Sequence, residues 1–299
     1  MIAWVLRGII LFAWAVGAAL AYWAYVRFAS GLAAAVAFLL VTNGITAFVV
    51  AMQFILAFIA NRSAGAKKLV ENMRFDQMWH AYAGELGAAV KVFTLWQAWW
   101  PSKSVDYLPA GLQKRGVLFL HGYFCNSALW LAHRALAREH GVPHIALTTE
   151  PAFGSLDAYL PEVHAAVERL RAATGHAPLI VGHSMGGLVA RAYVAAYGVS
   201  GLHGVITVGT PHHGTAHAER GLGDNARQMR LGSPWLVANA AQIGAEARAK
   251  FICFYSNGDN IVAPTESAAF EGADNRHIAA TGHVNLVFAP AVLAAIAIN

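Results

Sequence analysis

The sequence predicts an α/β domain, with a mostly parallel sheet and helices on both of its faces, preceded by two transmembrane helices. The first observation is that short apolar runs alternate with helical patterns after residue 115. The second is that Arg7 and Arg27 are the only charged side chains in the opening 60 residues. The third is a composition of 57% hydrophobic and 12% charged residues, whereas a soluble domain carries about 25% charged residues. Part of the chain is therefore expected to lie outside water.

Two uncharged stretches in the opening part are each long enough to cross a bilayer. Residues 8–26 and 32–60 contain no Asp, Glu, Lys or Arg, and about 20 apolar residues span the hydrocarbon core. Arg27 lies in the short connection between them, as a helical hairpin requires. Residues 1–61 are therefore predicted to form a transmembrane hairpin. The alternative is a signal peptide cleaved near "ALA" at 19–21, which still leaves the second stretch as an anchor.

Charged residues return in residues 62–114, which are predicted to form a connecting or interfacial helical segment. Aromatic residues persist in it, as in "FTLWQAWWP" at 93–101. The segment is expected either to lie on the membrane surface or to pack against the domain that follows. Pro101 and Pro109 indicate a loop that ends it.

Residues 115–299 are predicted to form the catalytic α/β domain. Six short apolar runs are typical of strands buried on both faces of a parallel sheet. Ser127 and Ser155 can cap the first two helices between these runs, and Gly141 and Gly175 follow the ends of those helices. The expected strands are 116–120, 144–147, 179–183, 204–210, 251–256 and 277–282.

Ser184 stands in "GHSMG", between an expected strand and a helical run. This is the G-x-S-x-G pattern of a nucleophile elbow, in which a strained turn presents the serine at the carboxyl end of the sheet. Small residues at Gly182 and Gly186 let the chain pass close to itself. The dipole of the following helix favours negative charge that develops near its first residues. Ser184 is therefore the candidate nucleophile.

A serine hydroxyl needs a base, and in this architecture the chain order is serine, acid, histidine. Asp259 directly follows the expected strand 251–256 and is the preferred acid, with Asp274 as a second choice. His283 follows the last expected strand and is the candidate base. His277 precedes that strand and would lie at its wrong end.

Backbone N–H groups are expected to stabilise the oxyanion of a tetrahedral intermediate. One is that of Met185, the residue after the candidate nucleophile, and the other is that of Tyr123, in the loop after the first strand. His121 and Gly122 end that strand. Cys125 lies near the loop, but Ser184 has the better context for a nucleophile.

Several other functions are not expected. The net charge of +5 comes without a Lys/Arg run, so no nucleic-acid partner is predicted and anionic lipid is the simpler partner. Cys125 and Cys253 form no CxxC pair. His212, His213 and His217 make zinc binding conceivable, but no carboxylate cluster matches them, so no metal is predicted.

These motifs together resemble those of bacterial lipases and esterases of the α/β-hydrolase superfamily, over about residues 115–299. The resemblance implies an α/β-hydrolase fold, a triad of Ser184, Asp259 and His283, an oxyanion hole at Tyr123 and Met185, and no cofactor. Residues 215–250 are expected to be either a cap over the acyl pocket or a plain crossover. The motifs that carry the resemblance are "FLHGYFCN", "EPAFGSLDAY", "VGHSMGGLVARAY", "VGTPHHGT", "RLGSPWL", "GDNIV" and "GHVNL".

The function expected from these features is that of a membrane-anchored serine hydrolase that cleaves lipid or other hydrophobic carboxylic esters through an acyl-enzyme. The alternatives are an acyltransferase with the same triad and a catalytically inactive membrane scaffold. The expected location is the bacterial inner membrane, with two spans. Excess positive charge at the outer ends of the spans predicts a cytoplasmic catalytic domain, with the periplasm as the alternative; the residues concerned are Arg7, Arg62, Lys67, Lys68 and Arg74, against Arg27 at the turn.

Overall fold

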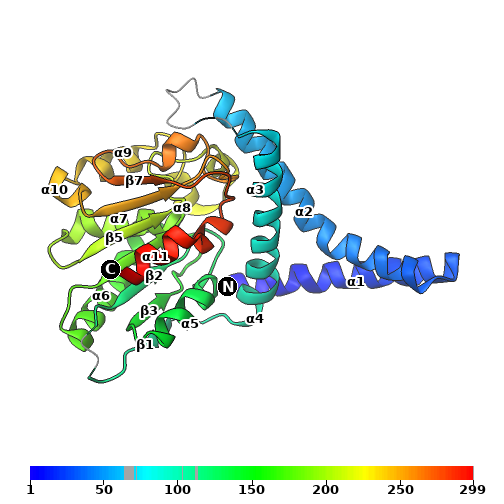
Figure 1. Ribbon diagram of the computed structural model, residues 1–299, viewed down its shortest axis with the longest axis horizontal. Coiled ribbons are helices and arrows are strands. Elements are labelled where there is room, and N and C mark those ends of the chain that lie inside the picture. Colours follow the sequence, from blue (N-terminus) through cyan, green and yellow to red (C-terminus); the bar gives the residue numbers. More distant parts are fainter. Residues whose placement is uncertain (64–70, 72, 103, 112–113, 299) are drawn as a thin grey trace.

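The computed structural model describes residues 1–63, 71, 73–102, 104–111 and 114–298. It has a sheet domain with helices on both faces and a helical hairpin that projects from it (Figure 1). Lys67 and Lys68, two of the positive charges that predict a cytoplasmic catalytic domain, lie outside the described residues.

One sheet of seven strands has the order β1-β3-β2-β4-β5-β6-β7, and only β1 runs antiparallel to its neighbour. Its parallel strands confirm the predicted fold class, because parallel strands need crossover helices that cover the sheet. The strands are β1 Ser104–Tyr107, β2 Val117–Leu120, β3 His144–Leu147, β4 Leu179–His183, β5 Gly204–Val208, β6 Phe251–Tyr255 and β7 Asp274–His277.

The two edge strands differ from the sequence-based expectation. The prediction of a last strand at 277–282 is wrong. The last strand, β7, covers "DNRH" at 274–277, and all four of its residues are exposed. The edge strand β1 was not predicted. Neither contains a continuous apolar run, because each has only one neighbouring strand, so apolar patterning does not reveal them.

Side chains of successive strand residues enter two different cores, one on each face of the sheet. Leu118 and Leu120 of β2 pack in the core under α6 (Leu160–Thr174) and α7 (Met185–Tyr197). Val117 and Phe119 pack in the other core, with α11 (Pro290–Ile298). The remaining helices of this domain are η2 Ser127–Trp130, α5 Leu131–Glu139, η3 Leu156–Tyr159, η4 Ala216–Arg220, α8 Gly223–Gln228, α9 Pro234–Ala241, α10 Ala245–Arg248, η5 Thr265–Ala268 and η6 Asn285–Phe288.

The predicted helix caps are partly right. Ser155 accepts a hydrogen bond from the backbone of Asp157 and caps η3, and Gly175 ends α6 with a φ of 72°. Ser127 is not a cap: the preceding Asn126 caps η2, and the α-helix α5 begins only at Leu131.

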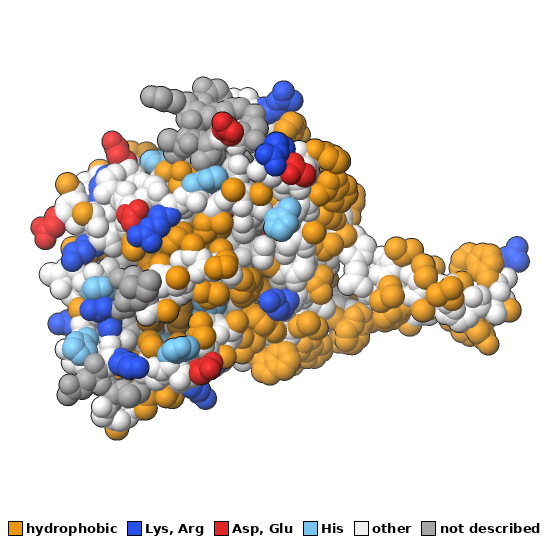
Figure 2. Space-filling view, in the orientation of Figure 1, with side chains coloured by type: hydrophobic (Ala, Val, Ile, Leu, Met, Phe, Trp, Pro, Cys, Tyr) orange, Lys and Arg blue, Asp and Glu red, His pale blue; other side chains and the backbone are white. Residues whose placement is uncertain are grey.

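The hairpin consists of α1 (Ile2–Phe28) and α2 (Gly31–Ser63), each long and apolar enough to cross a membrane. Figure 1 shows both of its open ends at the sheet domain and its turn at the far end. The helices touch closely at Gly17, where an added Cβ would lie 3.1 Å from atoms of Phe38 and Thr42. Hydrophobic side chains cover the hairpin surface (Figure 2).

The connecting segment forms α3 (Phe75–Ala89), the π-helical η1 (Val90–Trp96) and the short α4 (Gln97–Trp99). Its inner face is part of the second core, through Ala88 and Val92. Its outer face exposes large side chains such as those of Phe75 and Trp79. The segment therefore packs on the sheet domain and also offers aromatic side chains of the kind found at membrane interfaces.

Candidate active site

Ser184 lies on a sharp turn between β4 and α7. Its backbone has φ 55° and ψ −123°, a strained conformation for a residue with a side chain. The flanking glycines are required by space: a Cβ on Gly182 would lie 2.5 Å from the backbone nitrogen of Gly187, and one on Gly186 would overlap the carbonyl of Leu120. The predicted elbow is therefore present, and it holds the serine at the carboxyl end of the sheet.

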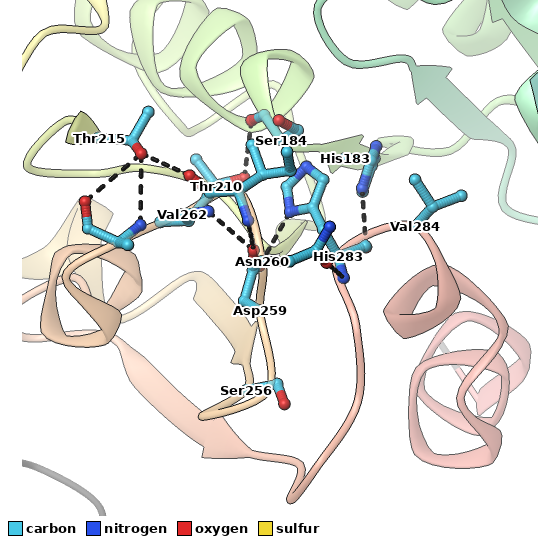
Figure 3. Close-up of polar contacts among 12 residues, drawn as sticks. His183, Ser184, Thr210, Thr215, Ser256, Asp259, Asn260, Val262, His283 and Val284 are labelled. Atoms are coloured by element: carbon cyan, nitrogen blue, oxygen red, sulfur yellow. Dashed lines mark hydrogen bonds and ion pairs between the residues drawn. The ribbon is translucent and has the colours of Figure 1, made fainter. Parts of the chain in front are cut away.

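Asp259 and His283 meet beside this turn, although 24 positions separate them. His283 Nδ1 lies 2.9 Å from Asp259 Oδ2, and the other carboxylate oxygen accepts hydrogen bonds from the backbone of Ile261 and Val262. Figure 3 shows the His283 ring between Asp259 and Ser184. A proton on Nδ1, donated to the carboxylate, leaves Nε2 free to accept a proton on the side of Ser184.

The surroundings of His283 act on its pKa in opposite directions. Burial lowers the pKa of the imidazole, but the charge and hydrogen bond of Asp259 and the charge of Glu85 raise it more, so the net pKa lies above its ordinary value. By contrast, burial holds the pKa of the neighbouring His183 well below its ordinary value. The two rings lie 4.6 Å apart. Of these two rings, His283 is therefore the one better suited to carry a proton.

The loop that carries Tyr123 passes directly over Ser184. An added Cβ on Gly122 would come within 3.0 Å of the Cβ of Ser184. The buried His121 fixes the loop, because its Nδ1 lies 2.8 Å from the Gly122 carbonyl and its Nε2 accepts from the backbone of Thr149. The hydroxyl of Tyr123 also bonds the backbone of Leu222. Met185 opens α7, where the first N–H groups of a helix lack partners within it.

Three residues considered in the sequence analysis lie away from this constellation. Asp274 is exposed and pairs with Arg276. His277 does not precede the last strand, as predicted, but ends β7, where its ring accepts from the backbone of Asn257. His212 is stacked on Phe270 in the core, 4.8 Å away.

Cys125 lies close to the site but is a poor nucleophile. Burial raises the pKa of its thiol to about 12, although a hydrogen bond from Gln97 opposes the effect. The reactive thiolate is therefore scarce at neutral pH.

Glu85 of α3 is a site residue that no sequence motif predicted. Its carboxylate is 2% exposed and accepts hydrogen bonds from the backbone of Val284 and Asn285, at 2.9 Å each. Burial raises its pKa, while these hydrogen bonds oppose the effect. Gly282 makes room for it, since an added Cβ would lie 2.5 Å from the Glu85 Cβ. The signal in the sequence is a lone carboxylate within the apolar stretch "AYAGELGAAV".

Gln53 of α2 also supports the loop that carries His283. Its side-chain oxygen accepts a hydrogen bond of 2.9 Å from Asn260, and Asn260 in turn accepts one of 3.0 Å from the backbone of His283. The loop that carries His283 is thus held by a residue of the sheet domain, by the connecting segment and by the hairpin.

A cavity of about 510 Å³ opens onto Ser184 and His283, within the size range of small-molecule sites. Residues 215–250 supply one wall through Ala218, Ala226 and Met229. The same segment packs on α7, where the buried Arg191 bonds the carbonyls of His212 and Leu236 and the side chain of Asn239.

Residues 117–249 match the family model of the α/β hydrolase fold. Among solved structures, the mature lipase BlEst2 from Bacillus licheniformis is 16% identical, and the match covers 62% of this chain and 93% of that one with a TM-score of 0.54. Lipase B from Aspergillus fumigatus is 18% identical, with 64% and 55% covered and a TM-score of 0.55. A putative non-heme bromoperoxidase, BpoC from Mycobacterium tuberculosis, is 14% identical, with 65% and 93% covered and a TM-score of 0.50.

No curated protein sequence matches the chain. The structural similarity to these proteins establishes the fold. Because the identities are low, the reaction has to be inferred from the site itself.

Proposed function

We propose that this chain, whose sheet domain has the α/β-hydrolase fold, is a membrane-anchored serine hydrolase that cleaves hydrophobic carboxylic esters. The observation that carries the proposal is the strained Ser184 beside the buried His283–Asp259 pair, at the floor of an apolar cavity. Strain and buried charge are costly, and they persist where a reaction needs them. The lipase and esterase motifs and the lipases among the similar folds support this chemistry.

In the proposed reaction, Ser184 attacks the ester carbonyl while His283 Nε2 takes the hydroxyl proton. Asp259 holds the imidazole in the required tautomer and stabilises its charged form. The backbone N–H groups of Tyr123 and Met185 donate to the oxyanion. His283 then protonates the leaving alcohol, which departs and leaves an acyl-enzyme. Water repeats the sequence, with its proton passing to His283, and the carboxylic acid is released.

Replacement of the serine tests this assignment. We expect Ser184→Ala to lower kcat on a p-nitrophenyl acyl ester by at least about a thousandfold, because the attacking oxygen is removed. Ser200→Ala, at an exposed position, is the matched control and should retain wild-type turnover. A fluorophosphonate probe should label the wild type and the control but not Ser184→Ala. Near-normal turnover by Ser184→Ala would refute the assignment.

Two outcomes would point to the alternative functions. Folded wild-type protein that resists the fluorophosphonate probe would indicate an inactive scaffold. A product that is a new ester, formed when an alcohol is added to the assay, would indicate an acyltransferase with the same acyl-enzyme.

We also propose that the hairpin spans the bacterial inner membrane twice, with the catalytic domain in the cytoplasm. The support is the apolar length of α1 and α2 and the placement of Arg7 and Arg62 at their open ends, against Arg27 at the turn. Alkaline phosphatase or a fluorescent protein fused to Asn299 tests the sidedness. A fluorescent fusion without phosphatase activity agrees with the proposal, and an active phosphatase fusion contradicts it.

A further inference from the structure

Part of the wall of the active-site cavity is built by the hairpin itself. Seven residues of the hairpin line it: Leu6 and Ile9 of α1, and Ile45, Thr46, Val49, Val50 and Gln53 of α2. These residues lie far from the catalytic motifs in the sequence, and all of them except Thr46 and Gln53 are aliphatic. The same cavity reaches Ser184 and His283 at its other end.

The hairpin residues that line the cavity form two groups. Leu6 and Val50 are buried, at 7% and 3% exposure. Ile9, Ile45 and Val49 are 53%, 53% and 46% exposed, so each lines the cavity and also reaches the outer surface of the hairpin. They therefore form a rim, at which the cavity meets whatever surrounds the helices.

The shape of the hairpin explains this opening. About midway along α1 the helices touch, with Gly17 against Phe38 and Thr42. Towards the sheet domain the two helices separate (Figure 1), and residues of α1, α2 and α3 together line the cavity there. The rim residues lie in this separated part. Because both helices are apolar enough to cross a bilayer, the medium outside the rim is hydrocarbon where the hairpin is inserted.

Two polar side chains beside this wall have partners: Gln53 is bonded to Asn260, and Glu85 accepts from the backbone of Val284 and Asn285. Apart from Thr46, the hairpin contributes aliphatic surface to the cavity, which suits an acyl chain better than a polar head group.

We propose that the space between α1 and α2 is an acyl-chain channel, through which the ester of a long-chain lipid reaches Ser184 sideways from the bilayer. The proposal rests on the ester hydrolysis proposed above and adds its substrate class. The carbonyl lies at Ser184, and the chain extends between Leu6 and Val50 towards the rim. An acyl chain that moves from lipid into such a channel stays in an apolar medium, so entry from the bilayer requires no exposure of the chain to water.

A bulky residue at the rim tests the channel. We expect Val49→Trp, assayed as the full chain in nanodiscs, to lower the ratio of kcat/KM for p-nitrophenyl palmitate to that for the acetate by at least tenfold. Val36→Trp is the matched control: it is the same change on α2, at 45% exposure, at a residue that does not line the cavity. It should leave the ratio unchanged. An unchanged ratio in Val49→Trp, in folded protein that still reacts with a fluorophosphonate, would overturn the proposal.

A binding measurement tests, independently of hydrolysis, whether an acyl chain occupies the channel. Palmitic acid with a diazirine at its end is photo-crosslinked to Ser184→Ala protein in nanodiscs, and the adducts are mapped by mass spectrometry. We expect adducts at residues 6–9 and 45–53 that excess palmitate suppresses, that Val49→Trp abolishes and that Val36→Trp retains. Adducts that excess palmitate does not suppress, or that Val49→Trp leaves in place, would exclude the channel. If wild-type protein hydrolyses no ester but shows the suppressible adducts, the proposed hydrolysis fails and the channel stands.

Discussion

The helices α7 and α2 are both apolar, and both lie near the active site: α7 begins directly after Ser184, and α2 lines the cavity, but their surroundings differ. Ten of the 13 residues of α7 are buried, whereas only Val50 and Ala57 are buried among the 33 residues of α2. A helix that is apolar all round needs an apolar environment on every side. For α7 the sheet and the neighbouring helices provide that environment, and for α2 a bilayer would provide most of it.

Polar contacts show the same difference. Around the sheet, polar side chains form a closed network, as at Asp259 with its two backbone donors and His283. In the helical part, polar side chains of α2 and α3 turn towards the catalytic loops: Gln53 bonds Asn260, Asn61 bonds Thr265, and Glu85 bonds the backbone after His283. The comparison supports the proposal that the helical part both anchors the chain in a membrane and positions His283.

The largest effect is expected within the sheet domain. We expect Asp259→Asn to lower kcat by about 10⁴, because an amide no longer selects the required tautomer of His283 or stabilises its charged form. Asp274→Asn is the matched control, since this exposed carboxylate pairs only with Arg276 in the described part of the chain. Ester hydrolysis and thermal unfolding should be measured on both variants. A greater loss of kcat in Asp274→Asn than in Asp259→Asn would indicate that Asp274, and not Asp259, is the acid of the triad.

The connecting helix should have the next largest effect. We expect Glu85→Gln to lower kcat about tenfold to a hundredfold with little change in KM, since a neutral amide accepts the backbone hydrogen bonds of Val284 and Asn285 more weakly than a carboxylate does. Its NH2 group also replaces one accepting oxygen, so the base is less firmly placed. Glu71→Gln is the control, because the side chain of Glu71 is exposed. If both variants keep wild-type kcat, the helical part does not position His283.

A smaller effect is expected from the hairpin. Gln53→Leu removes one hydrogen bond to the buried Asn260, which costs about 1 kcal/mol and corresponds to about a fivefold loss of kcat. Asn43→Leu is the control on the same helix, because the bonds of Asn43 stay within α2. Equal activity of the two variants would show that α2 contributes anchoring and cavity wall but no positioning.

The smallest change is a displacement of the pH profile. Hydrolysis needs neutral His283, and its pKa lies above the ordinary 6.5 because the charges of Asp259 and Glu85 outweigh burial. The acid limb of kcat/KM should therefore have its midpoint above 6.5, with activity lost as the pH falls through it. In Glu85→Gln the midpoint should move to lower pH, since one charge that favours the protonated ring is removed. An unmoved midpoint would mean that Glu85 acts on His283 through structure alone.

Much of the sheet domain could be predicted because its signals are local. The buried strands carry continuous apolar runs, and the Ser184 turn requires glycine at fixed positions, so both leave patterns that a few neighbouring residues reveal. Asp259 and His283 follow from the order of those strands, and the structure brings them within 2.9 Å of each other. The edge strand β7 was not predicted correctly, because its four residues are polar and exposed and carry no apolar pattern.

The sequence by itself determined the apolar hairpin, the parallel sheet and the candidate residues Ser184, Asp259 and His283, because burial and backbone strain restrict the residue types at each position. Only the tertiary structure decided that Glu85 lies beside Val284, 199 positions away, and that Gln53 reaches Asn260, 207 positions away. It also decided that α1 and α2 separate around the cavity. Such contacts depend on how whole helices pack, and a single glutamate or valine in an apolar stretch carries no mark of the partner it will meet.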